Sequence, residues 1–249
     1  MIIRLINKKS VLICAAVSFI SGVFIFLSRY TFGYEDPLYN NFLYIHDGDL
    51  TGLDFHLLLS VLNIVLLFPF ATELLTYHKS TNEIYIVSRM SNSARFYYIK
   101  FSQLALLCFA QSTVYNSSIL TAYCLLGHPA ESRSSLAGMF LYAVAVSFFV
   151  SLVFVSFLQL LETLINAKTA LILVIIIFCL SVLSGFKLPK EIAQYWPSNV
   201  YFITPFFASK ATLSLSFSVS ACAAFLIPIA ITAAITAAGS MIYKRKDHI

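Results

Sequence analysis

Six long apolar stretches constrain this chain more than any other feature of its sequence. They cover about residues 10–28, 54–76, 96–126, 135–161, 169–186 and 215–243, and they keep charged residues near their ends. A helix needs about 20 apolar residues to cross the hydrocarbon layer of a membrane. Open strand edges cannot satisfy their backbone groups in lipid, and a barrel would show short alternating segments. The sequence therefore predicts an all-α fold: one polytopic transmembrane helix bundle of about six spans over residues 1–249.

The balance of polar and apolar residues agrees with this prediction. Hydrophobic residues make up 59% of the 249 residues and charged residues only 11%, whereas soluble domains carry about 25% charged residues. A soluble globule of this size needs more polar side chains to cover its surface. The composition therefore excludes a soluble domain and indicates a chain whose solvent is lipid.

The distribution of basic residues predicts the orientation. With both termini in the cytoplasm, eleven of the sixteen Lys and Arg residues and four of the eleven acidic residues lie inside. Cytoplasmic loops of membrane proteins are enriched in Lys and Arg in this way. We therefore expect a multi-pass protein of a cell membrane with both termini cytoplasmic, and the high Phe, Tyr and Ile content is compatible with a bacterial plasma membrane. The net charge of +5 follows from this topology and requires no nucleic-acid partner.

The motifs of common membrane enzymes are missing from the sequence. It contains no H-E-x-x-H zinc helix, no G-x-S-x-G nucleophile turn and no G-x-x-x-x-G-K-[ST] phosphate loop. We therefore expect no catalytic residue, no metal ligand and no cofactor on this chain. If ATP drives the protein, another chain binds it.

Ionisable residues are absent from the middle of the predicted spans. Glu73 and Glu162 lie near inner ends, where we expect water or headgroups to reach them. Ion-coupled carriers usually keep an ionisable group deep in the bundle, so this pattern counts against secondary transport. Five amide residues could line a polar path, although hydrogen bonding between helices is the favoured role: they are Asn63, Gln103, Gln111, Asn116 and Gln159.

The longest polar segment facing the cytoplasm lies between the second and third predicted spans. It reads YHKSTNEIYIVSRMSNSAR over residues 77–95, and Ile84, Val87 and Met90 recur at a spacing of three. This spacing is typical of a short amphipathic helix. Such a helix could lie on the membrane surface or bind another protein, and the pattern leaves both open.

This arrangement resembles the permease subunits of ABC-2-type transporters, in particular the small bacterial ones linked to antimicrobial-peptide export and immunity. Those permeases often have a glutamate near the inner end of span two, followed by a segment with serine and arginine that leads into span three. Glu73 corresponds to the glutamate, and the following segment supplies Ser88, Arg89, Ser93, Arg95 and Lys100. The proline-broken segment 187–212 is similar to the outer re-entrant element of that family.

The resemblance implies that this chain is the transport subunit and not an enzyme. A separate P-loop ATPase would bind ATP and Mg, and a second permease subunit, identical or related, would enclose the transport path. The ATPase would dock on a coupling helix, with Glu73 as a bracing carboxylate that pairs with Arg89 or Arg95. The docking residues implied are Glu83, Ile84, Val87, Ser88, Arg89 and Arg95. The cargo would be a peptide or another amphipathic or hydrophobic molecule.

Two other classes of function stay open at this point. One is a non-ATP-linked membrane sensor or immunity protein, which would work in the absence of any ATPase. The other, less supported, is an intramembrane enzyme, in which one polar residue would be essential for activity but not for assembly. The sequence does not indicate the direction of transport or the identity of the cargo.

Overall fold

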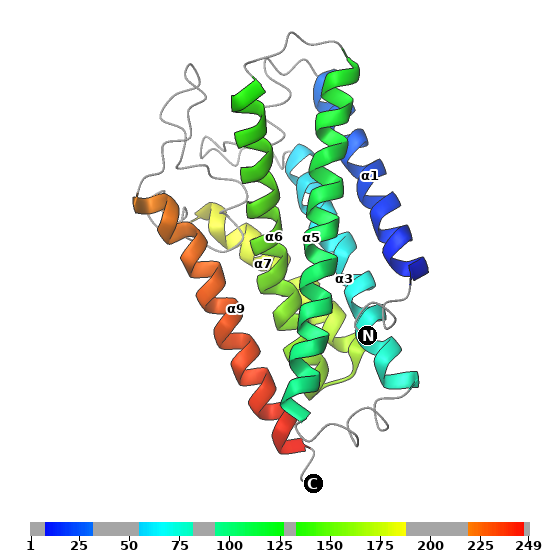
Figure 1. Ribbon diagram of the computed structural model, residues 1–249, viewed down its shortest axis with the longest axis vertical. Helices are drawn as coiled ribbons and strands as arrows, with labels where there is room; N and C mark the ends of the chain where they lie inside the picture. The colour runs from blue at the N-terminus through cyan, green and yellow to red at the C-terminus, as the bar shows by residue number, and fades with distance from the viewer. Residues whose placement is uncertain (1–7, 32–54, 82–92, 127–132, 188–218, 247–249) are drawn as a thin grey trace.

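The fold was described from a computed structural model, which places residues 8–31, 55–81, 93–126, 133–187 and 219–246. These residues form six α-helices and no strand, which confirms the predicted all-α class for the described part of the chain (Figure 1). The helices are α1 (Lys8–Thr31), α3 (Phe55–Thr81), α5 (Ser93–Leu125), α6 (Arg133–Leu164), α7 (Ala167–Lys187) and α9 (Val219–Lys246). Each coincides with one of the six predicted stretches.

The helices run alternately up and down the bundle (Figure 1). The start of α1, the end of α3, the start of α5, the turn between α6 and α7, and the end of α9 lie at the same end. We call it the charged end, because seven charged side chains lie there. These side chains are Glu73, Arg95, Lys100, Glu162, Lys168, Lys244 and Arg245. Keeping charge at the helix ends leaves the long middle of the bundle compatible with hydrocarbon.

Three helical segments are long and apolar enough to cross a membrane: Phe140–Leu164, Ala167–Ser184 and Phe225–Arg245. Shorter apolar segments, Val11–Leu27 and Val61–Thr76, lie in α1 and α3. These findings are based on the described residues and indicate a membrane protein. The most polar of the helices is α5, because Gln103, Gln111 and Asn116 interrupt its apolar sequence together with several Ser and Thr residues.

The position of α5 explains how it tolerates these polar residues. It packs against α1, α3, α6 and α9, so most of its sides face protein. Gly22 allows α1 to approach α5 closely, because a Cβ atom at this position would lie 2.7 Å from the Tyr115 backbone oxygen and would overlap the Ser118 hydroxyl. Small residues at such crossings are a common device in membrane bundles, where close backbone approach provides the packing energy.

The connection between α6 and α7 is short. The Ile165 backbone N–H donates to the Leu161 oxygen at 2.8 Å, which extends the end of α6. Asn166 then caps α7, because its side-chain oxygen accepts a hydrogen bond of 2.8 Å from the Thr169 backbone N–H. This tight turn holds α7 antiparallel to α6.

Candidate functional site at the charged end

The first two turns of α5 are held between α6 and α9 at the charged end. Gln159 of α6 donates a buried hydrogen bond of 3.0 Å from its side-chain nitrogen to the Tyr97 backbone oxygen. On the other side, the Tyr98 and Ser240 hydroxyl oxygens lie 3.2 Å apart. Because Ser240 donates its own proton to the Ala237 oxygen at 2.8 Å, Tyr98 is the donor between the two helices. Polar contacts thus link the beginning of α5 to both neighbours.

Aromatic packing reinforces the contact between α5 and α9. The Tyr243 ring centroid lies 6.0 Å from that of Tyr97 and 6.3 Å from that of Phe96. Gly239, one turn earlier on α9, faces the Tyr97 ring: a Cβ atom there would lie 2.5 Å from Tyr97 Cζ and would overlap the hydroxyl. The absence of a side chain at Gly239 is therefore what lets α9 lie directly against this tyrosine.

We call the place where the start of α5 meets α6 and α9 the junction. Two residues of opposite charge are buried there. Lys100 is 4% exposed and Glu162 is 3% exposed. The Lys100 Nζ atom lies 4.8 Å from the Phe96 ring centroid, a cation–π geometry. The Glu162 carboxylate is within electrostatic range of the Tyr97 hydroxyl. The expectation that water or headgroups reach Glu162 was therefore wrong, because its side chain is buried at the end of α6.

The predicted docking residues are only partly placed. Glu83, Ile84, Val87, Ser88 and Arg89 lie outside the described residues. Arg95, in the first turn of α5, has an exposed side chain, and so does Glu73 near the end of α3. Both therefore lie at the charged end, and Glu73 is accessible as expected. Its pairing with Arg89 or Arg95 stays a prediction.

The buried amides join helices, as the favoured interpretation predicts. Gln111 of α5 donates to both oxygens of Asn63 on α3, and its bond to the Asn63 backbone oxygen measures 3.2 Å. Asn116 donates to the Ser112 backbone oxygen at 2.8 Å and to Ser147 Oγ of α6 at 3.3 Å. With the contact of Gln159, four of the five amides take part in hydrogen bonds between helices, because Asn63 is the partner of Gln111. These bonds position α3 and α6 around α5.

Replacing Gln111 by leucine is expected to weaken the bundle modestly. Hydrogen bonds between helices in membranes contribute about 0.6 kcal/mol on average and up to ~2 kcal/mol. SDS titration of the purified Gln111→Leu, Asn63→Leu and double variants would measure the coupling between the two side chains. An interaction energy near zero in this double-mutant cycle would show that the Asn63–Gln111 contact does not stabilise the protein.

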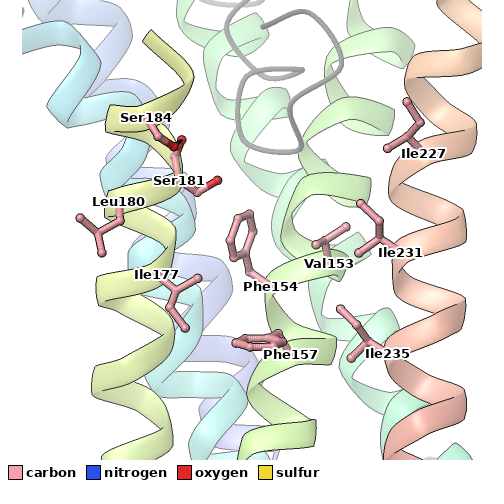
Figure 2. Close-up of a pocket in the computed structure, with 10 residues that line it drawn as sticks. All are labelled: Val153, Phe154, Phe157, Ile177, Leu180, Ser181, Ser184, Ile227, Ile231 and Ile235. Atoms are coloured by element: carbon pink, nitrogen blue, oxygen red, sulfur yellow. Dashed lines mark hydrogen bonds between the residues drawn. The ribbon is translucent and has the colours of Figure 1, made fainter. Parts of the chain in front are cut away.

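A groove opens between α7 and α9, with α6 as its floor (Figure 2). Its volume is about 790 Å³. Figure 2 shows Phe154 and Phe157 of α6 between Ile177 and Leu180 of α7 on one side and three isoleucines of α9 on the other: Ile227, Ile231 and Ile235. Its polar lining residues, Ser181 and Ser184, lie on α7. The groove is suited to apolar groups, and none of its described lining residues is charged.

Among the described residues, no group of three or more His, Cys, Asp or Glu side chains comes together as a metal site. The burial of Lys100 and Glu162 was not predicted from the sequence. The available signal was the position of Lys100 and Glu162 at the edges of two apolar stretches, since intramembrane ionisable residues usually mark functional sites.

Comparison with known proteins did not identify a family. No protein-family model, curated protein sequence or solved structure matches the chain.

Proposed function

We propose that this chain is the permease subunit of an ATP-driven transporter of the ABC-2 type, located in a bacterial plasma membrane. It would cross the membrane six times with both termini in the cytoplasm. It would act with a second permease and a separate ATPase that binds ATP and Mg. The cargo would be a peptide or another amphipathic or hydrophobic molecule, which the protein would export or to which it would confer immunity.

The junction at the charged end is the observation that carries this proposal. The predicted docking segment leads directly into α5, whose first turns are bound to α6 through Gln159 and to α9 through Ser240 and Gly239. A displacement of the docking segment would therefore move α5 together with parts of two other helices. Transmission of this kind, by rigid elements that shift as a unit, is how domain closure is relayed in many proteins.

The exposed charges support a cytoplasmic charged end. Five charged side chains are exposed among the described residues, and four of them are basic: Arg95, Lys168, Lys244 and Arg245. The fifth is Glu73. An excess of Lys and Arg next to membrane-spanning helices favours the cytoplasmic side. This placement would put the docking segment where an ATPase can reach it.

The groove supports an apolar or amphipathic cargo. It lies between α9, which the junction links to α5, and α7, which follows the short turn after α6. Movement of α9 relative to α7 would change the width of the groove. A ligand that fits it must leave its charged groups outside, because two serine hydroxyls are the polar partners among the lining residues that the structure describes.

The proposal is tested by isolating the tagged chain in mild detergent from its native host and identifying the proteins that accompany it by mass spectrometry. We expect a stoichiometric ATPase with a P-loop, which is lost when residues 84–89 are scrambled. A variant with Ile84→Leu and Val87→Ile serves as the matched control and should retain the ATPase. A preparation without any ATPase, from membranes in which the protein works, would contradict the proposal and favour a sensor or immunity protein.

A further inference from the structure

Contact between Tyr98 and Ser240 brings together two cationic helix faces. Residues three or four apart share a face of an α-helix, so Arg95 lies on the face of Tyr98 and Lys244 on that of Ser240. The start of α5 and the end of α9 both point to the charged end. Arg95 and Lys244 therefore both lie toward the charged end, each about one helical turn from the Tyr98–Ser240 contact.

These two cations are accessible. Arg95 and Lys244 have exposed side chains, and the exposed Arg245 follows on α9. The exposed acidic side chain in the described part of the chain is Glu73, on α3, which packs on α1, α5, α6 and α7. The pair of faces thus presents a concentration of positive charge to an external anion.

An exposed apolar surface continues from the cations toward the middle of the bundle. Tyr98 is 47% exposed, and Leu106 and Phe109 follow it on α5 with exposures of 57% and 54%. On α9, Met241 is 66% exposed beside Ser240. Along α5 the order from the charged end is therefore Arg95, the Tyr98 ring, the exposed Ser102 and then the apolar side chains of Leu106 and Phe109. A phospholipid has the same order of phosphate, glycerol ester and acyl chain, and Tyr is enriched at that interface in membranes.

We propose that this surface binds an anionic phospholipid, with the phosphate between Arg95 and Lys244. Arg245 would add to the positive field, and the acyl chain would lie along Leu106 and Phe109. Basic clusters beside membrane-spanning helices bind anionic headgroups in this way, and the guanidinium group matches the geometry of phosphate oxygens. The exposed apolar side chains of Leu106 and Phe109 favour a lipid over an acidic protein, because a soluble partner would not reach them in a membrane. This inference requires a membrane but no ATPase.

The test measures lipid binding by the purified chain alone. The protein is exchanged into micelles containing phosphatidylcholine with or without phosphatidylglycerol. Native mass spectrometry counts the lipid molecules that the protein retains, and the melting temperature is measured in the same samples. We expect phosphatidylglycerol to be retained and to raise the melting temperature. Each of Arg95→Gln and Lys244→Gln should weaken its retention about fivefold, and the double variant by about twenty- to thirtyfold.

Lys168→Gln is the matched control, because Lys168 is an exposed cation at the start of α7, away from this surface. It should retain phosphatidylglycerol like the unchanged chain. The inference is overturned if Lys168→Gln loses as much lipid as Arg95→Gln, if phosphatidylcholine is retained equally, or if inorganic phosphate alone reproduces the stabilisation. The same variants can be isolated from native membranes. If they keep the lipid but no longer copurify with an ATPase, the surface belongs to a protein partner and the inference is also overturned. Equal melting temperatures of all variants in phosphatidylcholine would show that a loss of phosphatidylglycerol retention is not caused by misfolding.

Discussion

Replacing Glu162 by leucine is expected to lower the free energy of unfolding by about 3–5 kcal/mol, because we expect its buried carboxylate to compensate the buried Lys100 ammonium, and breaking a buried ion pair usually costs this much. In the variant, the buried Lys100 ammonium would lose the one buried carboxylate among the described side chains. An isolated charge in a low-dielectric interior is strongly unfavourable. SDS titration or thermal denaturation of the purified protein measures the change.

Two further variants separate charge from packing at this position. Glu162→Leu combined with Lys100→Met removes both charges and should recover most of the lost stability, since uncharged replacements of buried ion groups are often neutral. Glu73→Leu is the control, and because Glu73 is exposed, its effect should stay within about 0.5 kcal/mol. If the double variant were no more stable than Glu162→Leu, the two charges would not compensate each other.

Gly22→Leu is expected to separate α1 from α5 and to cost about 3 kcal/mol or more. Overpacking a tight contact by even a small group usually costs about 1–3 kcal/mol. Here the obstacle includes the Tyr115 backbone oxygen, which is 2.7 Å from the position of the first added carbon and cannot rotate away as a side chain could. Loss of stability in detergent, together with proteolysis of the variant in membranes, measures the effect.

The matched control for this prediction is Ala16→Leu, which enlarges an exposed side chain on the same helix and should change stability by less than about 0.5 kcal/mol. Adding Ser118→Gly to the Gly22→Leu variant removes one of the two obstacles. It should restore only part of the stability, because the carbonyl oxygen stays in place. Full tolerance of leucine at position 22 would show that α1 does not approach α5 as closely as described.

The sequence predicted the helices well because their signal is local. Long apolar stretches leave the backbone no alternative to internal hydrogen bonds in lipid, and each predicted stretch lies within a few residues of a described helix. The close approach at Gly22 could not be predicted, since a glycine has many roles and only the neighbouring helix reveals this one. The same holds for Glu162, whose burial depends on how the other helices pack around the end of α6.

The candidate site was predicted only in outline. The bonding role predicted for the amides is confirmed for Gln111, Asn116 and Gln159, whereas the docking role of the segment before α5 stays a prediction. The groove depends on how far α7 and α9 diverge above α6, which no local pattern records. The contact between Tyr98 and Ser240 joins residues 142 positions apart in the chain and likewise belongs to the tertiary structure.

The central position of α5 also bears on how the protein enters its membrane. A helix that carries two glutamines, an asparagine and a lysine among its buried residues partitions poorly into lipid by itself. The amides find their hydrogen-bond partners on α3 and α6, and α6 is synthesised after α5. In a six-span arrangement, α5 would therefore have to be retained beside the insertion machinery until α6 emerges. Substitutions in α6 at Ser147 or Gln159 would then affect the membrane insertion of a helix that precedes them in the chain.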